Sequence, residues 1–152
     1  MMARAVLDDC WDVVMVGFNI LNQSARERVF THTLRHGIRV LDMFAVRRAL
    51  SQTAMLRETI AELVRQGLVE PDALDEVEPL GFLLREGGSH SLMDAAYRFC
   101  RVEPGVDVVL SGTGSVAHLE ANVASILRPP LPDSDRQRLM EIFARVDTVS
   151  GQ

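Results

Sequence analysis

Three apolar runs of strand length, interleaved with segments of helical periodicity, constrain the fold of this chain more than any other feature. The runs are mostly continuous rather than alternating, a pattern typical of parallel strands that are buried on both faces. They span residues 11–18, 38–46 and 106–110. Helical patterns span residues 23–35, 53–66, 91–101, 115–127 and 133–146. This order predicts an α/β fold with right-handed crossovers around a parallel sheet.

Glycine and proline mark the ends of several of these helices. Gly37 and Gly67 follow two of the helical patterns at the position where a left-handed residue commonly ends a helix. The prolines within residues 129–132 separate the last two helices. The stretch 70–78 is acidic and contains proline, so it is expected to be a solvated loop.

The number of strands indicates only part of a known architecture. A closed (β/α)₈ barrel uses about 250 residues, whereas this chain has 152 residues and three β/α units. We therefore expect a single domain over residues 1–152, a partial (β/α)₈ barrel with extra helices and two exposed sheet edges. If its strands are equivalent to the sixth, seventh and eighth, the loop after the third lies where such barrels commonly hold a phosphate.

Charge and hydropathy exclude several classes of protein. The formal net charge is -5, which argues against a general nucleic-acid or anionic-membrane surface. The longest apolar run, residues 13–21, is too short for a transmembrane helix, which needs about 20 residues. We expect a cytoplasmic protein in which Cys10 and Cys100 are small apolar residues rather than a disulfide.

The loop after the third strand has the composition of a phosphate-binding loop. Gly112 and Gly114 allow close approach of the backbone to an anion, and Ser115 can cap the helix that follows. That helix would present free N–H groups and a positive dipole end to the loop. The same Gly-x-Gly pattern also occurs in plain tight turns, and no glycine at position 117 completes a dinucleotide fingerprint.

Three segments carry a resemblance to a known family. Residues 112–122 read Gly-Thr-Gly-Ser-Val-Ala-His-Leu-Glu-Ala-Asn, residues 15–19 read Met-Val-Gly-Phe-Asn, and residues 37–46 run from Gly-Ile-Arg-Val to Met-Phe-Ala-Val. They are similar to segments in the C-terminal half of the aldo/keto reductases, which are NADP-dependent (β/α)₈ oxidoreductases. Met15 and Ala121 stand where relatives commonly have glutamine and glutamate.

The resemblance implies a role for each matching residue. It places the Phe18 ring on the nicotinamide, and Phe44 and Arg47 along the turn after the second strand. Arg47 and Arg48 would then be within reach of a pyrophosphate or a 2′-phosphate. On the phosphates and the adenosine it places six residues, Gly112, Thr113, Gly114, Ser115, His118 and Asn122. The implied cofactor is NADP, with NAD as the other possibility, and no metal.

The implied function is the NADP-binding C-terminal portion of an oxidoreductase that acts on a carbonyl or sugar substrate. The family's catalytic Asp, Tyr, Lys and His come from the first four strands of the barrel. This chain has no lysine, and its single tyrosine, Tyr97, falls within a helical pattern. The chain alone is therefore expected not to transfer hydride.

Other functions remain as alternatives. A non-catalytic nucleotide-binding or interaction module could cover its sheet edges by dimerising or by pairing with a complementing barrel half. His32 and His36 have the spacing of metal ligands on a helix, but no third ligand is evident. Residues 51–69 could be mistaken for a helix-turn-helix or winged-helix core, but the acidic composition disfavours DNA binding.

Overall fold

Three parallel strands form one sheet in the computed structural model, which describes residues 2–8 and 10–148. The sheet order is β1 (Val13–Gly17), β2 (Arg39–Met43) and β3 (Val108–Val109). In the register, Met15 lies beside Leu41 and Leu41 lies beside Val108. The predicted α/β fold with a parallel sheet is confirmed, although each strand is shorter than its apolar run.

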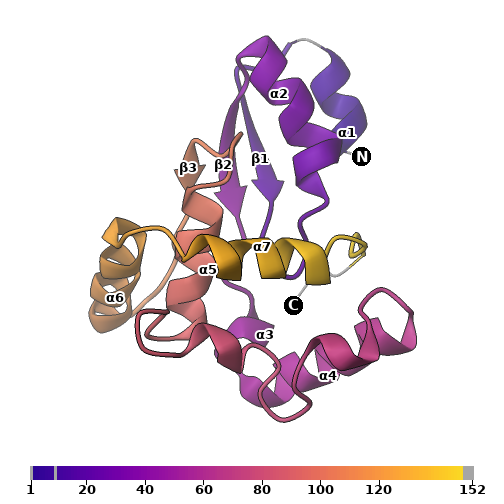
Figure 1. Ribbon diagram of the computed structural model, residues 1–152. Helices are drawn as coiled ribbons and strands as arrows, with labels where there is room; N and C mark the ends of the chain where they lie inside the picture. The colour runs from indigo at the N-terminus through magenta and orange to yellow at the C-terminus, as the bar shows by residue number, and fades with distance from the viewer. Residues whose placement is uncertain (1, 9, 149–152) are drawn as a thin grey trace.

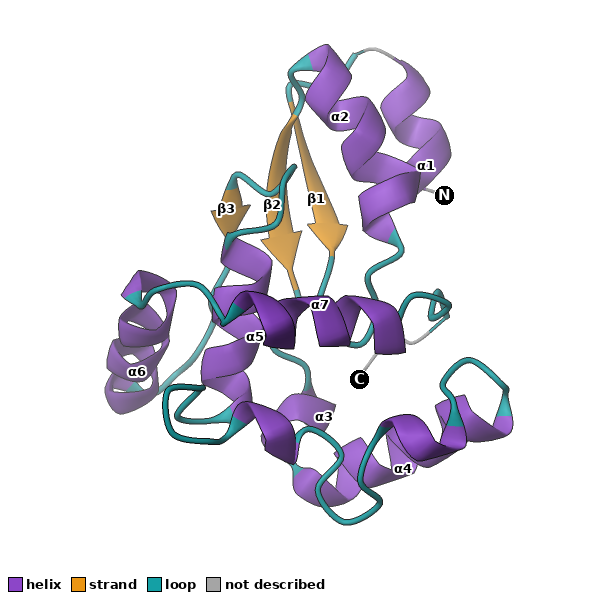
Figure 2. Ribbon diagram, in the orientation of Figure 1, coloured by secondary structure: helices purple, strands orange, loops and turns teal. Residues whose placement is uncertain are grey.

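Helices lie beside the sheet and beyond the carboxyl ends of its strands (Figures 1 and 2). The α-helices are α1 (Met2–Ala5), α2 (Thr31–His36), α3 (Arg48–Ser51), α4 (Thr53–Arg65), α5 (Leu92–Arg101), α6 (Val116–Leu127) and α7 (Asp133–Ile142). Short 3-10 turns are η1 (Val6–Asp8), η3 (Pro71–Ala73) and η4 (Gly81–Leu83).

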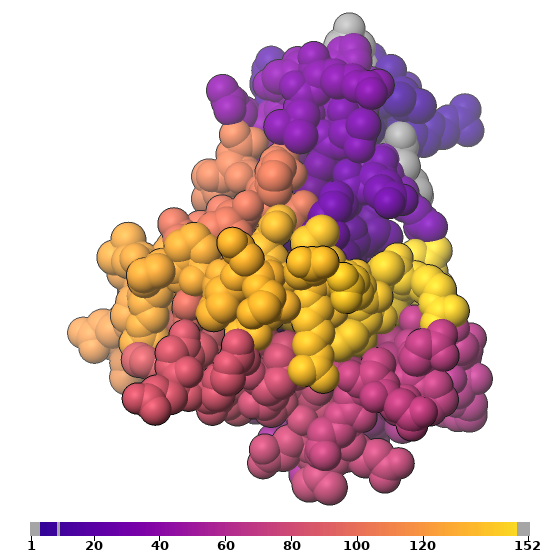
Figure 3. All heavy atoms as spheres, viewed as in Figure 1, coloured from indigo at the N-terminus to yellow at the C-terminus, as the bar shows by residue number. Residues whose placement is uncertain are grey.

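Two predicted helices have different forms in the structure. The pattern over residues 23–35 is a π-helical segment, η2 (Arg26–Phe30), that continues directly into α2. The last helix ends at Ile142, four residues before the end of its apolar pattern. It crosses the front of the molecule (Figure 3), with Leu139 and the following Phe143 completely buried.

The two faces of the sheet have different surroundings. Val14, Val16 and Val40 point into the main apolar cluster, whereas Val13 and Met15 on the opposite face are 48% and 45% exposed. The prediction that the strands are buried on both faces is therefore wrong. The described part of the chain covers one face of the sheet and leaves the other open.

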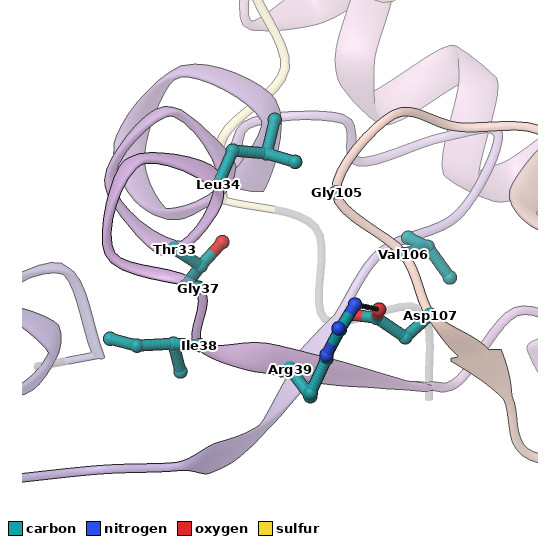
Figure 4. A pocket seen from close by; sticks show the side chains of 8 residues that line it. All are labelled: Thr33, Leu34, Gly37, Ile38, Arg39, Gly105, Val106 and Asp107. Atoms are coloured by element: carbon teal, nitrogen blue, oxygen red, sulfur yellow. Dashed lines mark hydrogen bonds and ion pairs between the residues drawn. The ribbon is translucent and has the colours of Figure 1, made fainter.

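A glycine turn sets the entry to β3. Gly105 has φ +97°, and a Cβ atom there would lie 2.7 Å from the Cβ of Phe30, so this close approach requires glycine. The turn borders a small cavity of about 140 Å³ at the amino ends of the strands (Figure 4). Beside it, Asp107 pairs with Arg39 at 2.8 Å and accepts the Val40 N–H, and this backbone hydrogen bond is the main cause that lowers the pKa of Asp107.

A carboxyl group is buried under the covered face of the sheet. Asp42 on β2 is 0% exposed, and its Oδ1 accepts the backbone N–H of Phe18 at 3.0 Å. Its Oδ2 has no hydrogen-bond partner among the described residues. Burial raises the pKa of Asp42 to about 7, although hydrogen bonds with Cys100 and Phe18 act in the opposite direction. The contact with Phe18 ties the end of β1 to β2.

Replacing Asp42 with asparagine should remove a pH dependence of the free energy of unfolding. The pKa is raised in the folded state, so the stability linked to this group is complete below its ordinary pKa of 3.8 and is lost as the pH rises through about 7. The parent chain should lose a few kcal/mol over this range, since one pKa unit corresponds to about 1.4 kcal/mol.

Urea unfolding of both chains at acidic, neutral and alkaline pH measures this effect. Asp42→Asn keeps an acceptor for the Phe18 N–H and should show the flatter profile. Parallel profiles for the two chains would contradict the assignment.

Candidate functional site

A groove of about 760 Å³ lies at the carboxyl ends of β2 and β3. The residues after β2, the loop after β3, and helices α5 and α6 supply its lining. Its volume falls in the range of small-molecule sites, about 300–1,000 Å³. Of the residues predicted to bind a cofactor, the structure brings five to this groove: Phe44, Gly112, Thr113, His118 and Asn122.

The loop after β3 is held by its own side chains. Thr113 Oγ1 accepts the Ser115 N–H at 3.1 Å, and Ser115 Oγ accepts the His118 N–H at 3.4 Å. Ser115 is therefore the N-cap of α6, as predicted, although neither it nor Gly114 is among the residues that line the groove.

The two glycines of this loop are not required by the fold. A Cβ atom at Gly112 or Gly114 would meet no atom within 4 Å, and neither residue has a positive φ. Space in front of the backbone is what a ligand needs to approach the N–H groups at the start of α6.

A hydroxyl pair that the sequence analysis did not assign to the site joins α5 to this loop. Tyr97 Oη donates to Ser111 Oγ at 3.1 Å, and Asn122 Nδ2 donates to the same oxygen at 2.9 Å. The Tyr97 side chain is 5% exposed and lines the groove. Because the contact joins residues from three separate elements, no local sequence pattern marks it.

Phe44 has an unusual backbone conformation in the turn after β2. Its φ is +72°, the only positive value among the described residues other than glycine. An L-residue in the left-handed region costs roughly 1–2 kcal/mol, and such strain often marks a functional position. The Phe44 side chain is 45% exposed along the groove, while Asn19 Nδ2 donates to its carbonyl oxygen at 3.3 Å.

Arg47 stands next to the groove rather than in its lining. Its guanidinium lies over the Phe44 ring, 3.7 Å from the ring centre. Its Nε is buried without a hydrogen-bond partner in the described part of the chain, and burial lowers the pKa of the side chain. The stack therefore holds a cation and an aromatic face beside the groove.

Phe18 lies outside the groove, in contrast to the role that the resemblance implies. The side chain is 0% exposed, and its ring packs against Phe30 and Phe99 at centroid distances of 5.4 and 5.7 Å. A ring enclosed in this way has no free face for a nicotinamide, so its observed role is in the core.

The lining of the groove is almost uncharged. It consists of apolar, hydroxyl and amide groups with His118, and none of the lining residues is Asp, Glu, Lys or Arg. Over residues 2–8 and 10–148, no group of three or more His, Cys, Asp or Glu side chains could hold a metal ion. Within the same residues, no helix has the length and hydropathy to span a bilayer.

A parallel β/α sheet with a groove at the carboxyl ends of its strands is the arrangement of the (β/α) enzymes. Comparison with known proteins identifies the family. The family model described as "Aldo/keto reductase family" matches residues 2–144, so the chain belongs to the aldo/keto reductases. The resemblance expected from the sequence is thereby confirmed. No curated protein matches the chain significantly.

Two solved structures similar to this chain are forms of the aldo-keto reductase AKR11C1 from Bacillus halodurans. The holo form has a TM-score of 0.60 and 18% identity, and the match covers 97% of this chain and 48% of that one. The apo form has a TM-score of 0.56 and 19% identity, with 92% and 46% covered. At this identity the likeness concerns the fold. The chain spans about half the length of these proteins, which supports a partial barrel.

The strain at Phe44 predicts an unusual order of stability for two variants. The free energy of unfolding, measured with urea, should be about 1 kcal/mol higher for Phe44→Gly than for Phe44→Ala. Both variants lose the ring, and only glycine tolerates the positive φ. At the preceding residue, Met43→Ala should be more stable than Met43→Gly, the usual order in a strand. If the alanine variant were more stable than the glycine variant at both positions, the backbone at Phe44 would not be strained.

Proposed function

We propose that this chain is the nicotinamide-dinucleotide-binding portion of an aldo/keto reductase-type oxidoreductase that acts on a carbonyl or sugar substrate. The observation that carries the proposal is the convergence of Phe44, Gly112, Thr113, His118 and Asn122 on one groove. In this proposal the three strands correspond to the sixth, seventh and eighth of the barrel. NADP is the cofactor that the resemblance implies, and NAD differs from it by one phosphate.

The residues of the groove fit a bound dinucleotide. The open space in front of Gly112 and Gly114 leaves the backbone accessible. Helix α6 begins directly after this loop, and the positive end of its dipole favours an anion there. The Ser111 hydroxyl, held by Tyr97 and Asn122, fixes the loop against α5 and α6. When bound, the cofactor supplies a hydride donor or acceptor, while the groups of this chain bind and orient it.

The side chains of this chain are not suited to proton transfer. The Tyr97 hydroxyl is buried and donates to Ser111, and the sequence has no lysine to lower the pKa of a tyrosine. We therefore propose that hydride transfer requires residues that a complete barrel would supply, and that this chain alone is inactive.

A second candidate function is association through the open face of the sheet. Val13, Met15 and Val108 are between 45% and 48% exposed, and they share this face with Leu110. Helix α6 adds a second apolar stripe at helical spacing, formed by Val116, Leu119, Val123 and Leu127. Exposed apolar surfaces of this kind favour a partner, either a second copy of the chain or a complementing half of a barrel.

Gly112→Val tests the nucleotide site. A branched Cβ at this position should abolish binding of NADH and NADPH because it fills the space in front of the backbone. Gly112→Ala should weaken binding less. Melting temperatures should stay near that of the parent chain, since a Cβ there meets no protein atom. Unchanged affinity of Gly112→Val, measured by fluorescence titration, would remove the site assignment.

Sedimentation measurements test the association. The parent chain should sediment as a species larger than one chain, and Met15→Glu should shift it toward the monomer by placing a charge on the open face. Val77→Glu is a matched control, because Val77 is an exposed apolar residue in the loop before η4 and not in a strand. A monomeric parent chain would contradict self-association.

A further inference from the structure

We infer that the groove takes a nicotinamide dinucleotide without a phosphate on its adenosine ribose, NAD(H), in preference to NADP(H). This inference rests on the proposed function and specifies its ligand. The volume of the groove does not distinguish the two dinucleotides, whereas the charges around it bear on the ribose phosphate.

The lining of the groove carries no fixed positive charge. A phosphate monoester on the ribose adds about two negative charges near neutral pH, and proteins that accept it commonly place an arginine beside it. None of the residues in the lining is Arg or Lys, and His118 is its only side chain that can become a cation.

The arginines of the neighbouring helices are committed to other partners. Arg98 on α5 is 5% exposed and donates to the carbonyl oxygens of Pro129 and Pro130. Arg101 donates to the Arg128 carbonyl oxygen at 2.9 Å, and Arg128 pairs with Asp94 at 3.1 Å. These contacts connect α5 to the end of α6 and engage the three guanidinium groups outside the lining of the groove.

The two arginines after β2 do not supply the missing charge. Arg47 lies over the Phe44 ring, and Arg48 is exposed on α3, so neither is part of the lining. In the proposed site, Arg47 and the start of α6 are the positive groups available to the two phosphates that both dinucleotides share. Arg48 is exposed outside the lining, so the lining itself offers no guanidinium to a third phosphate.

The lining carries neutral polar groups instead of a further cation. Ser111, Thr113 and Asn122 carry hydroxyl and amide groups, which exchange hydrogen bonds with uncharged ribose hydroxyls. A third phosphate in this setting would give up part of its hydration without gaining a charged partner, and this penalty is the physical basis of the preference.

Competing titrations of the full chain test the preference. We expect NADH to bind about tenfold tighter than NADPH or better, the ratio that corresponds to one missing charge-assisted contact. Adenosine 5′-monophosphate and adenosine 2′,5′-bisphosphate, which lack the nicotinamide and differ only in the ribose phosphate, should show the same order. Fluorescence of the reduced nicotinamide and calorimetry for the two adenosine probes supply the readouts.

An added arginine should reverse the preference. His118→Arg introduces a permanent cation into the lining and should shift the NADH to NADPH affinity ratio about tenfold toward NADPH. Gln137→Arg adds the same charge on α7, outside the groove, and should leave the ratio unchanged.

The possible outcomes distinguish failure of the NAD(H) preference from failure of the proposed nucleotide site. Equal affinities, or tighter binding of NADPH, would overturn the inference and leave the nucleotide site intact. A ratio that His118→Arg does not move would also overturn it. Failure of every nucleotide to bind would overturn the proposed function itself.

Discussion

Burial of one face of a three-stranded parallel sheet is the constraint on which the rest of this structure depends. Val14, Val16 and Val40 belong to the same apolar cluster as the rings of Phe18 and Phe99. A large apolar side chain contributes about 1.5–3 kcal/mol when fully buried, so this packing holds the helices on the sheet. Because parallel strands end at the same edge, it also brings the turn after β2 next to the loop after β3, and the groove forms between them.

The sequence predicts the order and type of the elements better than their surroundings. The apolar runs locate all three strands, and Gly37, with φ +68°, ends α2 as expected. The same runs suggest burial on both faces, because a continuous apolar strand looks the same whether or not its partners are present. The exposure of Met15 and Val108 is set by which segments pack on the sheet, which no local pattern reports.

The candidate site shows a similar division. The Gly-x-Gly motif, the cap at Ser115 and the positions of His118 and Asn122 follow from local sequence, since they lie within one loop and the helix after it. The contact between Tyr97 and Ser111 joins distant elements and was not predicted. Phe18 matches the family pattern, yet its ring fills the core, because side-chain direction at the end of a strand depends on tertiary packing.

The brevity of β3 has a consequence for motion. This strand has two residues, and its backbone is held to β2 on either side by the Asp107 N–H to the Val40 carbonyl and the Leu110 N–H to the Asp42 carbonyl. Because β3 pairs only two residues with β2, it opens locally at a smaller free-energy cost than global unfolding. The wall of the groove that follows β3 is therefore less firmly held than the β1–β2 pair, whose register runs from Val13 to Gly17. A molecule that contacts both walls would add to the bonds that hold β3 in place.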